Sequence, residues 1–226
     1  MTQRTNARVA GFAFLFYIAV GITQMVLSGP TQADDTAARL ALIARHAWRM
    51  RLNIVLTLVI CATAIVLATA LYGITRGEDP DLAIVGLAFR VGEGVLAGIG
   101  ALTSLGILWL ATDAPPSPAT TTIALAELLL QIQGWNVTLI ATFFALGSTV
   151  FSWLLLRGRM IPVALAWLGV VASVLLVVGL PLHLVEVISG SVAQILWLPM
   201  ALFEIPLGFW LLIRGVRPTA STLTPE

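Results

Sequence analysis

The chain has 226 residues, of which 59% are hydrophobic and only 10% are charged, and its mean hydropathy is +0.99. Soluble domains carry about 25% charged residues, so this composition excludes an ordinary soluble protein and indicates an integral membrane protein. The formal net charge of +1 lacks the basic excess of a nucleic-acid-binding surface, and we expect no nucleic-acid partner.

The first predicted element is a membrane span that follows a short polar lead. Residues 1–8 carry Arg4 and Arg8 and are expected to form a cytoplasmic lead. The apolar stretch 9–28 has the length of one bilayer crossing and lacks a good cleavage pattern, so we interpret it as a retained helix and not as a signal peptide. Gly29 and Pro30 then end this helix.

An amphipathic helix is predicted next, from Ala37 to Met50. The stretch 34–36, Asp-Asp-Thr, offers an N-cap, and apolar residues such as Leu40 recur at helical spacing against basic residues such as Arg39. A helix of this kind lies along the membrane surface, and Trp48 would lie at the level of the headgroups.

Five further spans are predicted, and the fourth of all six is longer than one crossing requires. We expect that span either to project beyond the hydrocarbon or to break near Gly134. The third is rich in glycine, which favours close approach of neighbouring helices and therefore a central position. The five spans cover approximately residues 52–74, 82–111, 120–156, 161–185 and 192–213.

The predicted fold is therefore an all-α integral membrane bundle of six transmembrane helices, with a short interfacial helix between the first and the second. We expect one transmembrane domain over residues 9–217, followed by a disordered cytoplasmic tail at 218–226. Seven arginines fall on the side of the N-terminus and four on the other side, all four in or beside the amphipathic segment. This asymmetry predicts that both termini are cytoplasmic.

Three segments carry a family resemblance. They are Arg8–Ile22, the stretch Phe89-Arg90-Val91-Gly92-Glu93, and the closing Glu204–Val216. The chain resembles the bacterial multi-pass membrane family known as DUF4386, a domain of unknown function, over roughly residues 8–217. The resemblance implies a polytopic helical protein of the bacterial cytoplasmic (inner) membrane. It implies no activity and no catalytic residue.

Three ionisable residues lie inside the predicted spans. At about 1.5 Å per residue, Arg90 lies about 12 Å and Glu204 about 15 Å from the cytoplasmic ends of their spans. Glu93 follows Arg90 by three residues and so lies on the same face of the helix. We therefore expect Arg90 to bridge Glu93 and Glu204. Such a bridge is either a structural ion pair or a site for a ligand, proton or cation, and both readings stay open.

A second polar set is predicted near the outer ends of the spans, as a water-accessible vestibule. His183 and Glu186 are three residues apart, so both can face one pocket. The signal for a metal site is weak, because the only other histidine is His46, and we expect no metal and no cofactor. The vestibule candidates are Glu127, Gln131, Asn136, His183 and Glu186.

Two functions from different classes are consistent with this pattern. The first is binding or transport of a small apolar or amphipathic molecule, a lipid included, in a cavity between the third, fourth, fifth and sixth spans. The second is a non-catalytic scaffold that stabilises a membrane protein partner, and an intramembrane enzyme ranks third. The chain has no P-loop, no Gly-x-Ser-x-Gly elbow and no His-Glu-x-x-His motif.

Overall fold

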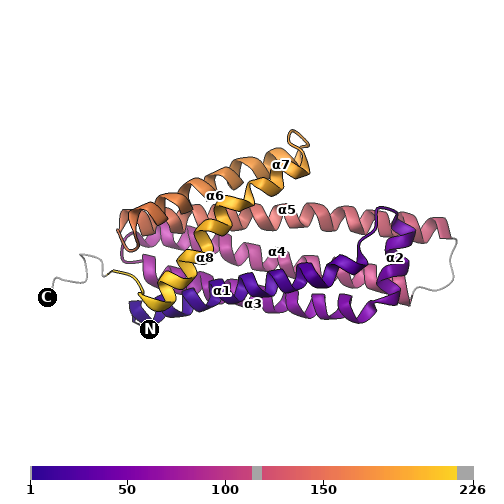
Figure 1. Cartoon of the computed structure of the whole chain (residues 1–226), viewed down its shortest axis with the longest axis horizontal. Coiled ribbons are helices and arrows are strands. Elements are labelled where there is room, and N and C mark those ends of the chain that lie inside the picture. The colour runs from indigo at the N-terminus through magenta and orange to yellow at the C-terminus, as the bar shows by residue number, and fades with distance from the viewer. Residues whose placement is uncertain (1, 114–118, 218–226) are drawn as a thin grey trace.

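A computed structural model describes residues 2–113 and 119–217, and this part of the chain is helical without any strand (Figure 1). The loop predicted around residues 114–118 and the tail predicted at 218–226 lie outside the described residues. The elements are α1 (Gln3–Ser28), the 3₁₀ turn η1 (Gly29–Thr31), α2 (Thr36–Arg45), α3 (Ala47–Thr75), α4 (Pro80–Thr112), α5 (Ala119–Arg157), α6 (Val163–Leu184), α7 (Gly190–Ile195) and α8 (Trp197–Ile213).

Side-chain caps begin several of these helices. The Asp35 side chain accepts a hydrogen bond from the Ala38 amide at 2.7 Å and begins α2. Asp79 does the same for the Leu82 amide at 3.1 Å, and Pro80 occupies the first position of α4. Both caps satisfy amide donors that a helix start leaves free, and proline is well suited to the first position.

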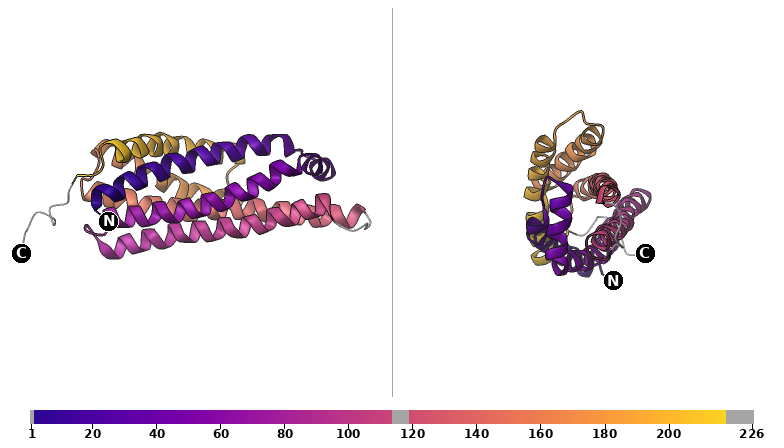
Figure 2. Two further views of the ribbon diagram at one scale, coloured as in Figure 1. Left: turned by 90° about the horizontal axis from the view of Figure 1, so that it is seen from below. Right: turned by 90° about the vertical axis from the view of Figure 1, so that its right-hand side faces the viewer.

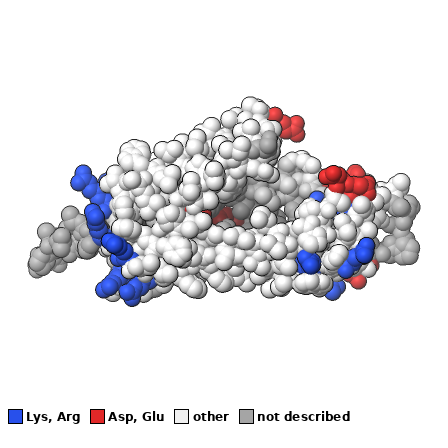
Figure 3. Space-filling model, in the orientation of Figure 1, with Lys and Arg blue, Asp and Glu red and all other residues white. Residues whose placement is uncertain are grey.

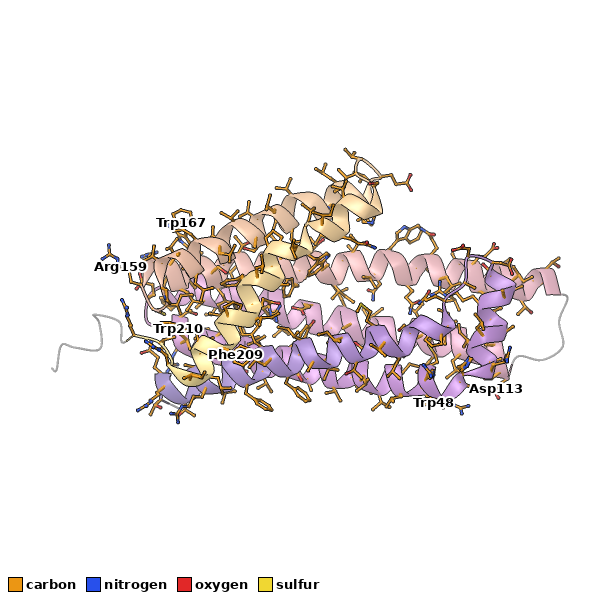
Figure 4. All side chains as sticks on the ribbon, in the orientation of Figure 1. Trp48, Asp113, Arg159, Trp167, Phe209 and Trp210 are labelled. Atoms are coloured by element: carbon orange, nitrogen blue, oxygen red, sulfur yellow. The ribbon has the colours of Figure 1, made fainter. Side chains whose placement is uncertain are left out.

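Five helices are long and apolar enough to cross a membrane, namely α1 with η1, α3, α4, α5 and α6, and α8 is a shorter apolar helix. The short α2 lies crosswise at the end of the bundle opposite the termini (Figures 1 and 2). Charged side chains gather mainly at the two ends of the molecule, and the belt between them is largely uncharged apart from acidic atoms beside a hollow (Figure 3). Trp48 marks the α2 end of this belt, and Trp167 and Trp210 lie towards the other end (Figure 4).

The long helices pack in a ring. In order around it, the contacting neighbours are α8, α1, α3, α4, α5 and α6, and α6 closes the ring by contacting α8. Among the described residues the backbones of α1 and α5 stay apart, so the ring has an interior, which side chains of both helices fill near the termini. The views along and across the bundle show this curved arrangement (Figure 2).

The ring is held together at the end where the termini lie. Arg157, at the end of α5, forms ion pairs with Glu78 and Asp79 of the α3–α4 turn, each at 3.1 Å. The Arg217 amide donates to the Met160 carbonyl at 3.0 Å. These contacts join the α3–α4 turn, the α5–α6 connection and the chain after α8. The solvent-exposed ion pairs contribute only about 0–1 kcal/mol each to stability.

The structure decides between the two alternatives for the fourth span and corrects the sixth. α5 is continuous through Gly134, and at about 1.5 Å per residue its 39 residues reach about 58 Å. It therefore projects beyond a hydrocarbon layer of about 30 Å instead of breaking. The predicted sixth span is divided at Leu196 into α7 and α8, because α7 ends in a tight turn there.

The second half of the ring is shorter than the first. α6 and α8 have 22 and 17 residues, against 26 to 39 for α1, α3, α4 and α5. α6 and α7 also diverge from α5 towards the α2 end of the bundle (Figure 1). The ring is therefore closed near the termini and incomplete in its other half, where the interior opens between α1 and α5.

Candidate functional site

A buried ion pair lies in the middle of the ring. Arg90 Nη1 is 2.8 Å from Glu93 Oε2, and each residue is only 1% exposed. The two side chains are three positions apart on α4, which places them on one face of that helix. The Tyr17 hydroxyl of α1 donates a hydrogen bond of 2.8 Å to Glu93 Oε1. Both oxygens of the Glu93 carboxylate are therefore held from within the bundle.

The guanidinium of Arg90 has capacity for a further partner. Its Nε and Nη2 atoms are buried and form no hydrogen bond with any described residue. The charge lies 4.8 Å from the centre of the Phe144 ring and 5.9 Å from that of Tyr17, and such cation–π contacts contribute about 0.5–2 kcal/mol. Gly147 provides the space, since a Cβ there would be 2.8 Å from Arg90 Cγ.

Glu204 does not complete the predicted bridge. It lies on α8 and is half-buried, and no ion pair joins it to Arg90 among the described residues. Arg90 nevertheless faces this part of α8, because it lines a small cavity of about 10 Å³ together with Phe203 and Leu207. Glu204 is thus a neighbour of the ion pair without being part of it.

A large cavity begins at Tyr17, the hydrogen-bond partner of Glu93, and extends to the α2 end of the bundle. Its volume is about 540 Å³, and its walls come from α1, η1, α2, α3, α4 and α5. The space-filling view shows this face hollowed, with acidic atoms at the edge of the hollow nearer the termini (Figure 3). Residues that line the cavity include Tyr17, Gln24, Ser28, Arg39, Ile43, Asn53, Thr57, Ala97, Ser104, Gln133, Asn136 and Ile140.

Polar side chains cross-link the walls of the cavity. Gln24 donates to the Thr57 hydroxyl at 2.9 Å, and Asn53 donates to the Ser28 hydroxyl at 2.7 Å, which joins α1 to α3. Across the cavity, Gln133 donates to the Ser104 hydroxyl at 2.9 Å. Asn53 Oδ1 is buried and accepts no hydrogen bond from the described residues. These contacts fix a polar surface inside an otherwise apolar bundle, and one acceptor remains free.

Arg39 of α2 lines the α2 end of the cavity. It is the one charged side chain among the described lining residues, and its Nε is buried without a hydrogen-bond partner. It also lines an adjoining cavity of about 320 Å³ with Asp34 and Glu127, but no ion pair forms with either. Burial lowers the pKa of the Arg39 guanidinium from its usual value, because its charge is incompletely solvated there.

The predicted vestibule residues fall into three places. Asn136 is buried in the wall of the large cavity and donates to the Leu96 carbonyl at 3.1 Å. Glu127 and Gln131 line the adjoining cavity. His183 and Glu186 lie at the end of α6, where His183 Nδ1 is 3.2 Å from the Ile188 carbonyl oxygen. The structure therefore does not bring these five residues into one pocket.

The position of the large cavity differs from the sequence-based expectation. No described residue of α6 or α8 lines it, whereas the expected cavity lay between the third, fourth, fifth and sixth spans. The difference arises because the short α6 and α8 leave the ring at this level. Within residues 2–113 and 119–217, no three His, Cys, Asp or Glu side chains group as metal ligands.

Sequence reasoning missed Tyr17, Gln24 and Arg39 as members of the site. Tyr17 lies about 21 Å along α1 from Gln3, far from the helix start where an interfacial tyrosine belongs. That depth was the available signal for Tyr17. Arg39 had no comparable signal, since it was one of several basic residues on an amphipathic helix.

Together, these features define an all-helical protein with several helices able to cross a membrane and a polar-lined cavity among them. The sequence profile of the family described as a domain of unknown function (DUF4386) matches residues 9–215, most of the chain. The protein belongs to this family, as the resemblance of its three segments indicated. No curated protein and no solved structure matches it.

Proposed function

We propose that the protein binds, or moves across the membrane, a small amphipathic molecule held in the cavity between α1 and α5. The observation that carries the proposal is the cavity itself. Its volume of about 540 Å³ falls within the range of about 300–1,000 Å³ that is usual for small-molecule sites. Its walls combine apolar residues such as Ile43 and Ile140 with fixed polar groups such as Gln24 and Asn53.

The shape of the bundle supports entry from the side. α1 and α5 form opposite walls of the cavity, and their backbones stay apart. The face between them is hollowed (Figure 3). An amphipathic molecule dissolved in the bilayer can reach such an opening without crossing water. Arg39 in the cavity wall favours an anionic headgroup, because a carboxylate or phosphate would satisfy its free donor and its charge.

The membrane topology is part of this proposal. We propose six spans, with α8 as the sixth, both termini in the cytoplasm and the bacterial cytoplasmic membrane as the location. Support comes from the arginine-rich end of the molecule where the termini lie (Figure 3). A bilayer is then the constant partner, and an amphipathic molecule or lipid is the proposed ligand.

Filling the cavity tests the proposal. Ile140 lines the cavity on α5, and its neighbour Leu139 is 41% exposed and is not among the lining residues. We expect Ile140→Trp to remove a co-purified ligand and Leu139→Trp to retain it, because only the first indole enters the cavity. Native mass spectrometry of gently extracted protein measures the bound mass and its stoichiometry. A ligand retained equally by both variants would show that the cavity is not its site.

The headgroup preference has its own test. Removing a charged hydrogen-bond partner costs about 1.5–3 kcal/mol, so we expect Arg39→Gln to weaken binding of an anionic amphipath by about tenfold to a hundredfold. Arg45→Gln is the matched control, because Arg45 is exposed on the same helix and does not line the cavity. Titration with lauric acid, followed by intrinsic tryptophan fluorescence, measures the affinity. Equal affinities for both variants would contradict the role of Arg39.

A further inference from the structure

Glu204 is a carboxylic acid at membrane depth without a partner. It lies about two helical turns from either end of α8 and is half-buried. Within the described residues it makes no hydrogen bond and no ion pair. An ionised carboxylate at the centre of a bilayer costs several kcal/mol unless it finds a counter-ion or water. In the six-span arrangement proposed above, its position therefore calls for a cation, a proton or contact with water.

The charges around Glu204 come from α4. Arg90 and Glu93 are the charged groups close enough to interact electrostatically with Glu204. Tyr17 of α1 is close enough to interact with all three of these side chains. The other helices supply no charge at this depth: α5 carries Glu127 and Arg157 in its outer parts, and α6 carries only His183, in its last turn. α7 has no titratable residue.

A count of these charges shows what is missing. Arg90 contributes one positive charge, which Glu93 neutralises at 2.8 Å. An ionised Glu204 would leave the group with one uncompensated negative charge in an apolar interior. Burying an unpaired charge is far more costly than burying the neutral acid. The group is electrically neutral only when Glu204 carries a proton.

Arg90 can respond if that proton leaves. Its Nε and Nη2 donors have no partner in the described residues, and it lines the small cavity with Phe203 and Leu207 on either side of Glu204 in sequence. An ionised Glu204 would therefore compete with Glu93 for the same guanidinium. Glu93 is in turn the acceptor for Tyr17, whose side chain lines the large cavity.

We propose that Glu204 is a proton-binding site, and that loss of its proton to water transfers Arg90 from Glu93 towards Glu204. In the arrangement seen here the acid is neutral, Arg90 pairs with Glu93, and Tyr17 is hydrogen-bonded to Glu93. After proton loss, α8 is drawn towards α4 and the Tyr17 contact at the cavity floor is altered. The proton goes to water, which the partly exposed Glu204 residue can reach.

A hydrophobic carbodiimide tests the first half of the proposal. Dicyclohexylcarbodiimide reacts with a neutral carboxylic acid, whose O–H adds across a C=N bond of the reagent. We expect the full-length protein in micelles to be labelled at Glu204, with the label decreasing as the pH is raised from about 5 to about 9. Peptide mass spectrometry locates the label. Glu93 serves as the internal control and remains unlabelled, because Arg90 and Tyr17 hold both its oxygens.

Two outcomes would overturn the assignment of a proton. One is the absence of label at Glu204 across this pH range. The other is protection of Glu204 by Na⁺ at constant pH, which would identify a metal cation as its occupant. Neither outcome depends on a ligand in the large cavity, so this test and that of the proposed function can fail separately.

The exchange of Arg90 has a separate test. In Glu93→Gln the guanidinium loses its charged partner, and the glutamine preserves the size of the side chain. We expect labelling of Glu204 in this variant to fall about tenfold at neutral pH, because Arg90 then stabilises the Glu204 carboxylate. A tenfold change in the protonation equilibrium corresponds to about 1.4 kcal/mol. Unchanged labelling in Glu93→Gln would overturn the coupling between the two carboxyl groups.

Discussion

Arg90→Met is expected to destabilise the protein by about 3–5 kcal/mol, because it leaves the buried Glu93 carboxylate without its counter-ion. Protonation of Glu93 limits this loss, but the Tyr17 hydrogen bond then has a weaker acceptor. Unfolding of the protein in micelles by a denaturing detergent, followed by tryptophan fluorescence, measures the change. Arg159→Met is the control, since Arg159 is an exposed arginine at the end of the bundle.

Replacing the whole buried group distinguishes a charge effect from a packing effect. In Tyr17→Phe/Arg90→Met/Glu93→Leu no polar group of the trio remains. Apolar replacement of a buried ion pair is often neutral or stabilising, so we expect most of the lost stability to return. Should the single Arg90→Met variant unfold no more readily than Arg159→Met, the ion pair does not stabilise the fold. A triple variant as unstable as the single one would attribute the loss to packing.

Gly11→Ala is expected to separate α1 from α8. A Cβ at Gly11 would lie 2.7 Å from the Gly208 carbonyl oxygen and 2.9 Å from Leu212 Cα, and both are backbone atoms that cannot rotate away. Close backbone approach at small residues is how membrane helices pack, and overpacking costs about 1–3 kcal/mol or more. The same unfolding measurement in micelles detects the loss.

Gly21→Ala is the matched control on the same helix. A Cβ at Gly21 meets no atom within 4 Å. Alanine is favoured over glycine within a helix by about 1 kcal/mol, so the change at Gly21 is expected to be neutral or stabilising. The two substitutions are chemically identical and differ only in what surrounds them. Equal effects at the two sites would contradict the close crossing of α1 and α8.

The sequence predicted much of the fold because membrane spans depend on local properties. Composition and the lengths of the apolar stretches located the helices, and the Asp35 and Asp79 caps follow from residue type and position. The spacing of Arg90 and Glu93 placed both on one face of a helix, and they are in contact there. These features depend on residues that are close together in the chain.

The candidate site was predicted only in part, because it is built from five helices. Asn136 lines the cavity, but His183 and Glu186 lie away from it, and Tyr17 was not anticipated. Depth along each span could be estimated from the sequence, but the order of the helices around the ring could not. Residues at the same depth meet only if their helices are neighbours.

The sequence alone determined that this is a helical protein with spans able to cross a membrane, since burial of apolar side chains and internal backbone hydrogen bonding are local requirements of a bilayer. Tertiary structure alone decided that α6 and α8 do not complete the ring in its α2 half. That packing outcome leaves α1 and α5 apart and creates the cavity. It also leaves Glu204 beside the Arg90–Glu93 pair and outside it, since a side chain on α8 can reach α4 only across the interior of the ring.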